Sequence, residues 1–329
     1  MTQPVVSILI SLTDHSDIIE IAESVAAQAG NLPLEIIAVD SSGHPETGHQ
    51  LNSIPASLAE RVCLQAVTVE QAGRGRALNE AVLRAKSELY LFLGDDFIPE
   101  PEWLATHLEF HATHTADEDV GIGPGVFPEE LRADPLMRWL DDSSLAFDAN
   151  FTGNGPLPLP PTWFYGANTS IKRQFFWRAG LFDDDFPYDA LEDYELGFRL
   201  FRLGMRVTYL PAAKAIHQHT IDLPYRLEAQ RRKGESFALL DAKYTEGPLS
   251  DKRPGRRSIR HLVRAVGWRV LSWFKSSASV REAEWFERME AAFYAGYEQT
   301  WKQLAKTARP ARRLFASLPA DAEGTARSG

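Results

Sequence analysis

Two adjacent carboxylates, Asp95 and Asp96, follow a short apolar segment and could bind a cation. The segment Leu89–Leu93, bounded by Gly94 and Pro99, is typical of a strand that is buried on both faces. Two acids at the end of such a strand are destabilised by desolvation and mutual repulsion unless a cation is present. Ligands bind at this end of the strands in open α/β sheets, and a hard divalent cation with a phosphate ligand suits paired carboxylates. A solvated turn, in which Asp is common, is the alternative interpretation.

A third carboxylate and a glycine-rich segment point to the same kind of site. Asp40 ends a second apolar segment, Leu34–Val39, so two predicted strands deliver carboxylates to one edge of the sheet. Residues 73–79 (GRGRALN) open a predicted helix with glycines and cations, which suits a diphosphate. The match to a dinucleotide-binding fingerprint is incomplete, because Leu78 stands where the third glycine belongs.

Further candidates lie in the second half of the chain. Glu192, Asp193 and Glu195 lie at the start of a predicted helix. The helix dipole accounts for Glu192 and Glu195. Asp193 could accept a proton if this helix start faces a cleft. His217 and His219 alternate after a predicted strand, where either could ligate a metal or could be an ordinary polar or core residue.

The elements that must position these residues alternate between strand and helix. The predicted strands lie at 5–10, 34–39, 62–69, 89–93 and 207–210, and the predicted helices at 18–29, 75–86 and 191–203. Repeated strand–helix units predict a parallel sheet with right-handed crossovers. The regular pattern lapses from 127 to 161, and beyond about Gly234 the chain is predicted to be helical. We therefore expect an α/β fold.

Composition limits the class of protein. The chain has 329 residues, of which 44% are hydrophobic, so it can bury one large core or two smaller ones. We expect a cytoplasmic protein, because no secretory leader is evident and the longest apolar runs are shorter than a membrane span. Cys63 is the only cysteine; it excludes a disulfide within the chain and is predicted to be a small core residue.

The order of these motifs resembles that of the inverting glycosyltransferases of family 2, which have the GT-A fold. The matching segments are 11–13, 39–43, 76–79, 92–96, 166–171, 180–183, 192–197 and Pro211 followed by His217, and the segment 92–96 resembles the family's DXD-type metal motif. The resemblance covers about residues 5–235. It implies a GT-A-type, mostly parallel sheet flanked by helices, and the sequence pattern beyond about Gly234 adds a helical C-terminal extension.

The resemblance also implies a domain organisation. Residues 1–235 would form the catalytic domain, with a nucleotide half at about 1–126 and an acceptor half at about 127–235. Residues 236–317 would form a helical region. The polar residues 318–329 are expected to be a disordered tail.

Roles follow residue by residue from the resemblance. Asp193 would be the catalytic base, while Asp96 and His217 would ligate Mn²⁺ or Mg²⁺. His217 is preferred to His219 because its spacing from Pro211 suits the family better. The nucleotide sugar would be bound by Thr13, Asp40, Arg76, Asn79 and Asp95, with Asp40 at the nucleobase and Asp95 at the ribose or sugar. The acceptor would be contacted by Trp163, Tyr165 and Glu192; core packing is an equal alternative for the aromatic pair.

The implied reaction moves a sugar from a nucleoside diphosphate sugar, UDP-linked by preference, to a hydroxyl of a glycan or lipid-linked acceptor in cell-envelope or surface glycan synthesis. One displacement with a single base inverts the anomeric carbon. Gly94 departs from the family, since many members have an Asp there, and Leu78 replaces a frequent Arg.

Two other functions were weighed against this one. A nucleotidyltransferase-like sugar-phosphate enzyme would need a glycine-rich, basic loop after the first strand, but residues 11–15 (SLTDH) contain neither glycine nor Lys or Arg. A non-catalytic nucleotide-binding module of the same fold would not require Asp96, Asp193 and His217 together.

Charge is unevenly distributed along the chain. The net charge is −10, which disfavours a nucleic-acid partner, yet residues 252–275 hold eight Lys or Arg and no Asp or Glu. These cations alternate with aliphatic residues and Trp, as in a peripheral helix at an anionic membrane surface. The other interpretation is a helix that packs its apolar side onto the catalytic domain. Gly267 and the broad apolar spread favour packing.

Overall fold

The computed structural model describes residues 3–13, 18–41, 53–69, 73–143, 164–186, 190–244, 257–275 and 277–307. The chain divides into two compact units, Met1–Asp222 and Leu223–Gly329. In the part of the chain that is described, no helix has the length and hydrophobicity needed to cross a membrane. Trp163 and the expected tail at 318–329 lie outside the described residues.

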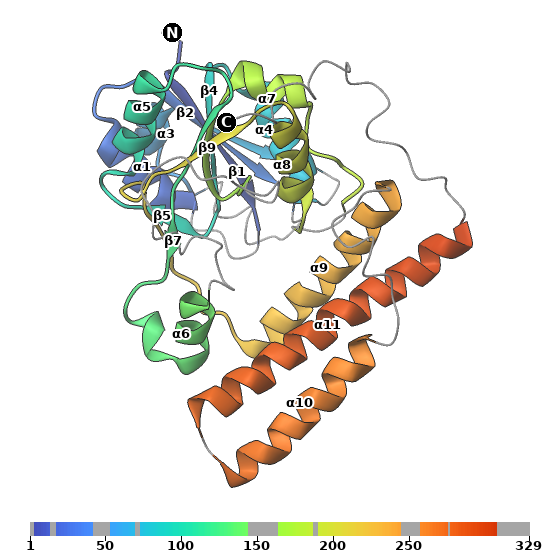
Figure 1. The fold of residues 1–329 in the computed structure, drawn as a ribbon. Helices are drawn as coiled ribbons and strands as arrows, with labels where there is room; N and C mark the ends of the chain where they lie inside the picture. The colour runs from blue at the N-terminus through green and yellow to red at the C-terminus, as the bar shows by residue number, and fades with distance from the viewer. Residues whose placement is uncertain are drawn as a thin grey trace, which may run out of the picture. The chain divides into compact units, whose positions relative to one another are not determined.

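The first unit is built on a seven-stranded sheet with the order β3-β2-β1-β4-β8-β6-β9 (Figure 1). Its strands are β1 (Val6–Leu12), β2 (Leu34–Asp40), β3 (Leu64–Thr68), β4 (Leu89–Leu93), β6 (Asp119–Ile122), β8 (Asn168–Lys172) and β9 (Arg206–Tyr209). All neighbouring pairs are parallel except those made by β8, which runs antiparallel to β4 and β6. The α/β fold class and the mostly parallel sheet predicted from the sequence are confirmed.

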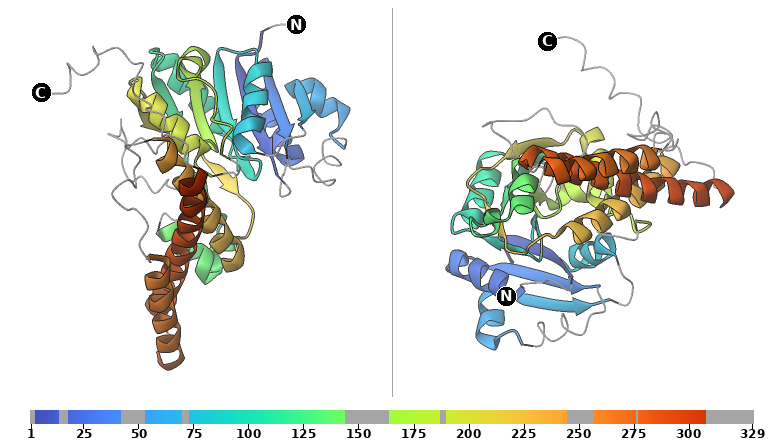
Figure 2. Two further views of the ribbon diagram at one scale, coloured as in Figure 1. Left: turned by 90° about the vertical axis from the view of Figure 1, so that its right-hand side faces the viewer. Right: turned by 90° about the horizontal axis from the view of Figure 1, so that it is seen from below.

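Helices cover both faces of this sheet (Figures 1 and 2). One face packs against α1 (Ile18–Ala29), α3 (Ala56–Val62) and α5 (Trp103–Thr113), and the other against α4 (Arg74–Arg84), α7 (Arg173–Ala179) and α8 (Glu192–Arg202). The central strands β1, β2 and β4 are buried along their whole length, because both faces are covered. Their mostly apolar sequences follow from that burial, and the buried Ser7 hydroxyl donates to the buried Glu35 carboxylate of the neighbouring strand at 2.6 Å.

A second, three-stranded sheet lies beside the carboxyl end of β4. It has the order β5-β10-β7, formed by β5 (Phe97–Pro99), β10 (Ala215–His217) and β7 (Gly125–Val126). Strand β10 is antiparallel to β5 and parallel to β7. This small sheet brings a segment near residue 217 next to the residues that follow β4. The remaining helices of the unit are a 3-10 turn (Leu131–Ala133) and α6 (Pro135–Asp142).

Residue 63 corrects one prediction from the sequence. Cys63 was predicted to be a core residue of a strand at 62–69, but it lies between α3 and β3 with φ 44° and is exposed. A left-handed backbone at this point turns the chain from helix to strand, so the side chain leaves the core.

The second unit is formed by α9 (Leu223–Lys243), α10 (Arg257–Phe274) and α11 (Ala278–Thr307). Helix α11 packs against both α9 and α10. Backbones of α9 and α11 cross closely: a Cβ atom at Gly234 would lie 1.9 Å from the Phe293 carbonyl oxygen, and one at Gly296 would lie 2.1 Å from that of Arg231. The compact units divide at 222/223, whereas the expected boundary at 235/236 falls inside the continuous helix α9.

Candidate active site

The carboxyl ends of three adjacent parallel strands meet at one edge of the large sheet. Asp40 ends β2 and pairs in register with Leu12, the last residue of β1. Its side chain is buried, with 3% of its surface exposed. Thr13 follows β1 directly, and Asp95 follows β4 on the other side of β1. Three positions predicted to bind the nucleotide sugar are therefore delivered to this edge.

Asp95 joins the ends of β1 and β4. Its Oδ2 atom accepts hydrogen bonds from the Thr13 backbone N–H at 2.5 Å and from the Thr13 hydroxyl at 2.8 Å. The Asp95 side chain is buried, and burial raises its pKa to about 7, with a further rise from the neighbouring Asp96 charge. The Thr13 hydrogen bonds and the Arg74 charge oppose this rise in the Asp95 pKa.

Asp96 contacts a histidine from the far end of the unit's sequence. The antiparallel pairing of β10 with β5 places His217 opposite Phe97, and the His217 Nε2 atom lies 2.8 Å from the Asp96 Oδ2 atom. Burial opposes ionisation of Asp96, but the hydrogen bond from His217 and the charges of His217 and His219 outweigh it and lower the pKa of Asp96. The His217 ring lies edge-on to Phe97 and Phe127, with centroids 5.2 Å and 5.3 Å away.

Gly94 has a steric reason for departing from the family pattern. A Cβ atom at this position would lie 2.5 Å from the Phe97 ring and 3.0 Å from the Asp96 Oδ1 atom. A larger residue would displace the ring that packs on His217, so the tight turn after β4 requires glycine.

The start of α8 presents the candidate base. Leu191, at the N-cap, has φ 73°, a left-handed conformation that is strained for a residue with a branched side chain. Asp193 in the first turn is 24% exposed. Its Oδ1 atom accepts a hydrogen bond from the Tyr194 backbone N–H at 2.7 Å, and its Oδ2 atom accepts one from the Gly166 N–H at 3.3 Å. The carboxylate is thus held by backbone donors while still reachable from solvent.

Arg74 is a site residue that the sequence analysis did not single out. Its guanidinium donates to the Glu192 Oε1 atom at 2.5 Å and to the Gly166 carbonyl oxygen at 2.6 Å, and lies 4.0 Å from the Asp193 Oδ2 atom. Because its charge also lowers the pKa of Asp95, Arg74 links the start of α8 to the end of β4. The signal was the glycine-rich basic segment at 73–79.

Two glycines make room for this arginine. A Cβ atom at Gly166 would lie 3.0 Å from both terminal nitrogens of Arg74. One at Gly75 would lie 3.2 Å from Phe182 and 3.4 Å from Glu192. Small residues at these points let the guanidinium lie against the backbone of residue 166 and let α4 approach α8.

Glu192 was expected to contact the acceptor, but its side chain is only 1% exposed and faces Arg74. Burial raises the pKa of Glu192 to about 7, the Asp193 charge adds to the rise, and Arg74 opposes it. Its Oε2 atom is buried and has no hydrogen-bond partner among the described residues. This environment favours a positioning role for Glu192 over direct contact with an acceptor.

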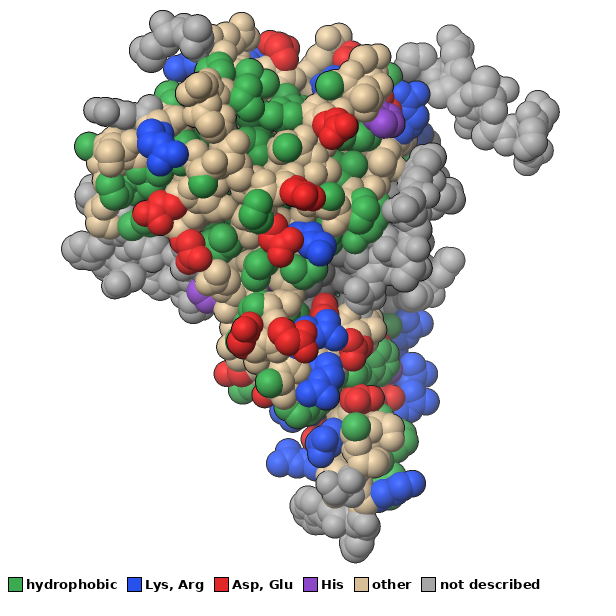
Figure 3. Space-filling model, turned by 90° about the vertical axis from the view of Figure 1, so that its left-hand side faces the viewer, with side chains coloured by type: hydrophobic (Ala, Val, Ile, Leu, Met, Phe, Trp, Pro, Cys, Tyr) green, Lys and Arg blue, Asp and Glu red, His purple; other side chains and the backbone are tan. Residues whose placement is uncertain are grey.

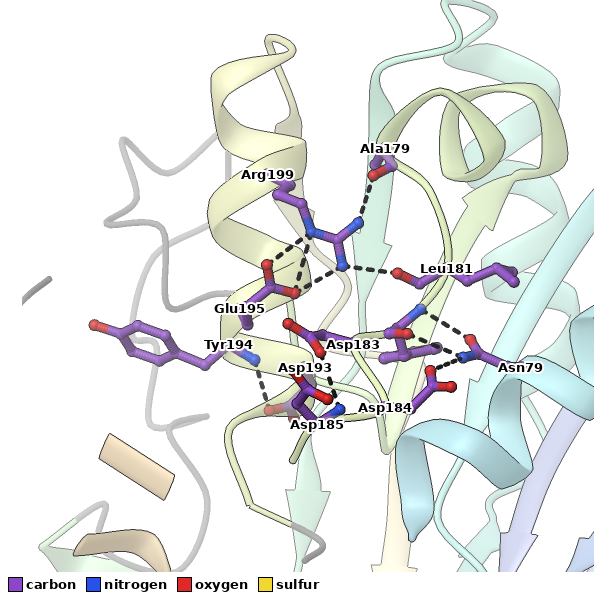
Figure 4. A network of polar contacts seen from close by, with 11 residues as sticks. Asn79, Ala179, Leu181, Asp183, Asp184, Asp185, Asp193, Tyr194, Glu195 and Arg199 are labelled. Carbon is purple, nitrogen blue, oxygen red and sulfur yellow. Dashed lines mark hydrogen bonds and ion pairs between the residues drawn. The ribbon is translucent and has the colours of Figure 1, made fainter. Parts of the chain in front are cut away.

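Asn79 is held by the loop that precedes α8 (Figure 4), and Arg76 also contacts this loop. The buried Asn79 amide donates to the Phe182 carbonyl oxygen at 2.9 Å and accepts from the Phe182 N–H at 2.8 Å. It also donates to Asp184 at 3.2 Å. Asn79 therefore attaches this loop to α4. These hydrogen bonds use most of the donors and acceptors of its amide, so few are left for the nucleotide contact expected from the sequence. The half-exposed Arg76 lies 3.8 Å from the Asp184 carboxylate and keeps a solvent-facing side chain.

The beginning of the same loop, at residues 179–181, is attached to α8. Arg199 donates to the carbonyl oxygens of Ala179 and Leu181 and forms an ion pair with the buried Glu195 (Figure 4). Glu195 is thus a structural residue. Figure 4 also shows the Tyr194 ring pointing away from this network.

Of the aromatic residues expected at the acceptor, Tyr165 lies within the described residues. It is partly buried, and its ring packs edge-on against Phe97 at a centroid distance of 6.4 Å. Phe164 is fully buried in the core. Tyr165 therefore lies beside the turn that carries Asp95 and Asp96, consistent with either packing or acceptor contact.

Comparison with known proteins identifies the family. The sequence pattern of Glycosyl transferase family 2 matches residues 8–180, just over half of the chain. The chain belongs to this family. The resemblance drawn from its motifs is therefore confirmed, and the matched range contains the ends of β1, β2 and β4 and the Gly166 segment.

Relatives and structural neighbours agree with this assignment. The chain is 25% identical over 227 residues to validoxylamine A glucosyltransferase of Streptomyces hygroscopicus subsp. limoneus, covering 62% of this chain and 49% of the relative. It is 37% identical over 171 residues to chondroitin synthase of Escherichia coli, covering 43% and 24%. The chain thus spans about half of the first relative and about a quarter of the second.

A mannosyltransferase from Pyrobaculum calidifontis, solved with GDP-Man and Mn²⁺, has a similar fold. The TM-score is 0.54 at 17% identity, with 89% of this chain and 87% of the other covered. This likeness shows the GT-A-type fold.

Proposed function

We propose that this protein is an inverting, metal-dependent glycosyltransferase that moves a sugar from a nucleoside diphosphate sugar to an acceptor hydroxyl. Beyond the family, one observation carries the proposal: the Gly166 N–H donates to Asp193, and the carbonyl oxygen of the next residue, Ala167, accepts a hydrogen bond from the Gly94 N–H at 2.9 Å, directly beside Asp95. A candidate base and the carboxylates at the end of β4 thus belong to one site.

Asp193 serves as the base. Its carboxylate, oriented by the backbone N–H groups of Gly166 and Tyr194, takes the proton from the acceptor hydroxyl as that oxygen attacks the anomeric carbon. The bond between the anomeric carbon and the diphosphate oxygen breaks, and the nucleoside diphosphate leaves with the electron pair. A single displacement from the opposite face inverts the configuration and needs no second nucleophile.

Asp96 and His217 would hold the divalent cation. Their Oδ2 and Nε2 atoms face each other at 2.8 Å; the carboxylate suits Mn²⁺ or Mg²⁺, and the imidazole nitrogen favours Mn²⁺ over Mg²⁺. Burial and the neighbouring Asp96 charge raise the pKa of Asp95, and a bound cation would oppose both effects. Among the described residues no group of three or more His, Cys, Asp or Glu could hold a metal, so water and diphosphate oxygens would complete the coordination. A bound cation would supply Lewis-acid stabilisation of the departing diphosphate.

The remaining roles concern the donor and acceptor. Thr13 and the buried Asp40 would frame the nucleobase, Asp95 would face the ribose or sugar, and the solvent-facing Arg76 would approach the diphosphate. A UDP-sugar is the preferred donor, and a GDP-sugar is the first alternative to test. Trp163 and Tyr165 would contact a glycan or lipid-linked acceptor. The name of one relative, chondroitin synthase, supports glycan synthesis. The proposed setting is the cell envelope or surface, with the enzyme on the cytoplasmic side.

The test begins with a panel of UDP- and GDP-sugars, scored by Mn²⁺-dependent hydrolysis and by thermal stabilisation. For the best donor, Asp193→Asn should preserve donor affinity and lower turnover by about 10²–10⁴-fold. Asp96→Ala should abolish transfer and weaken Mn²⁺-dependent binding of the nucleoside diphosphate measured by calorimetry.

Asp117→Asn is the matched control. Asp117 precedes β6 and therefore lies at the amino end of that strand, away from the carboxyl ends of the parallel strands that form the site. Turnover should therefore not change. Normal turnover in Asp193→Asn would show that Asp193 is not the base. Full activity in the presence of a chelator would show that the reaction needs no metal. Nucleotide binding without turnover for any donor or acceptor would favour the non-catalytic module.

A further inference from the structure

Helix α10 buries its polar side. Among the described side chains of α10, the most buried ones are polar or small: His261 and Ala265 are 6% and 4% exposed, and Ser258 is partly buried. A helix that stabilises a unit by apolar burial would do the reverse.

Polar contacts attach this side of α10 to α11. Glu298 accepts hydrogen bonds from the Ser258 backbone N–H and, at 2.8 Å, from the Ser258 hydroxyl. The His261 Nδ1 atom lies 2.6 Å from the Glu287 carboxylate, and the His261 ring stacks on Tyr294 with centroids 5.4 Å apart. These contacts fix which face of α10 points outward.

The outward face carries an apolar stripe. Its described members are Ile259, Leu262, Val263, Val266 and Val270, with exposed fractions of 57%, 56%, 65%, 56% and 44%. They recur at i, i+3, i+4, i+7 and i+11, the spacing of one helical face. Such a continuous exposed apolar surface is unusual in a folded unit and marks an interaction site.

Arginines flank the stripe on both sides. At 3.6 residues per turn, Arg260 and Arg264 lie along one flank and Arg269 along the other. Arg260 and Arg269 are exposed and make no ion pair within the described residues, and α10 contains no Asp or Glu. In the space-filling view, blue basic side chains stand beside green hydrophobic ones on the helical unit (Figure 3).

We propose that the outward face of α10 docks on an anionic lipid bilayer, with the stripe in the headgroup–acyl boundary and the flanking arginines on lipid phosphates. Interfacial helices combine these two features. Pairing of two copies through this face is disfavoured, because it would bring uncompensated arginines of like sign together.

An adjoining groove enlarges the apolar surface available to lipid. It has a volume of about 380 Å³ and runs between α9, α10 and α11, lined by Leu227, Ile259, Leu262, Ala291 and Ala295. Two of these residues, Ile259 and Leu262, belong to the stripe. The groove therefore opens where acyl chains would meet the docked helix.

Co-sedimentation of the full chain with vesicles tests the proposal without any need for turnover. The protein should bind phosphatidylcholine vesicles that contain phosphatidylglycerol, should not bind pure phosphatidylcholine, and should release as salt is raised. Arg260→Gln with Arg269→Gln should weaken partitioning by about 30-fold, since each cation near the surface contributes about fivefold.

Val263→Ser with Val266→Ser should also weaken binding, although it changes no charge. Lys86→Gln with Lys214→Gln, which removes two exposed cations of the first unit, controls for net charge. Leu83→Ser, 57% exposed on α4, controls for loss of a surface apolar group. Neither control should lower partitioning. Circular dichroism must show that each variant is folded.

Three results would overturn the proposal. These are no binding to anionic vesicles, a loss of vesicle binding in the two controls as large as in the α10 variants, and vesicle binding that is unchanged in both α10 variants. A concentration-dependent dimer that becomes monomeric in Val263→Ser with Val266→Ser, without vesicle binding, would assign the face to a second copy instead.

Discussion

Replacing Arg74 by Met removes a cation from a buried site while keeping an unbranched side chain. The guanidinium donates to Glu192 and to the Gly166 carbonyl oxygen, and Glu192 is only 1% exposed. Losing one partner of a buried ion pair costs about 3–5 kcal/mol when the remaining group stays charged. Glu192 can avoid part of that penalty by binding a proton.

The penalty should therefore depend on pH. Burial first, and then the Asp193 charge, raises the pKa of Glu192 to about 7, and Arg74 holds it down. Without Arg74 this pKa rises further. Below pH 7 Glu192 is protonated in both proteins, so Arg74→Met loses only hydrogen bonds, about 1.5–3 kcal/mol. Above pH 7 only the wild type ionises, so the destabilisation grows by about 1.4 kcal/mol per pH unit until the pKa of the variant is reached.

Pulse-labelling hydrogen exchange across a urea series measures this difference. Peptides from residues 3–222 report the unfolding free energy of the first unit separately from the helical unit. Arg178→Met is the matched control, because its ion pair with Glu118 at 2.8 Å is exposed and should contribute less than about 1 kcal/mol. An equal loss below and above pH 7, or an unchanged pH dependence in a Glu192→Gln background, would refute the reasoning.

Turnover gives a second readout of Arg74. The Gly166 N–H that holds Asp193 belongs to the residue whose carbonyl Arg74 binds. As a positioning residue, Arg74 should affect kcat more than the KM for the donor. A rise in KM alone would place Arg74 in donor binding.

Two further predictions concern stability. Gly296→Ala should lower the unfolding free energy of the helical unit by about 1–3 kcal/mol or more, since the new Cβ would lie 2.1 Å from the Arg231 carbonyl oxygen. Gly267→Ala, where nothing lies within 4 Å, should raise it, and exchange on peptides from 223–307 measures both. Burial lowers the pKa of His107 to about 4 and of His111 to about 3. Their contribution to the stability of the first unit is therefore complete above about pH 6.5, and it is lost as the pH falls through the pKa values of the folded state. Replacing both by Gln should flatten the acid side of the stability curve of the first unit; an unchanged curve would contradict it.

The strands at the centre of the sheet could be predicted because their signals are local. The apolar runs before Asp40 and Asp95 end where the strands end, and parallel pairing then places both at one edge. The fold class and the family followed from such segments. The helix Ile18–Ala29 was predicted with the observed bounds, since its apolar positions recur at helical spacing.

Contacts between distant segments could not be predicted in the same way. Arg74 meets Glu192 across 118 residues, and Asn79 meets the Phe182 backbone across 103. Periodicity carries no information about such pairs, and the roles of Asn79 at the nucleotide and of Glu192 at the acceptor were implied by the family resemblance alone. Only the glycines at 75 and 166 indicate that another part of the chain approaches the backbone closely at these points.

The direction in which α10 faces illustrates the same limit. The sequence allowed its apolar side to pack onto the catalytic domain or to meet a membrane, and packing was favoured because Gly267 and the broad apolar spread weaken the amphipathic pattern. Within the helical unit, α11 offers Glu287, Tyr294 and Glu298, which contact His261 and the first residues of α10. Because these polar contacts occupy one side of α10, the aliphatic residues and unpaired arginines must lie on the other. An apolar face that is exposed within the unit contributes burial free energy only through contacts outside the unit, and vesicle binding measures one such contribution directly.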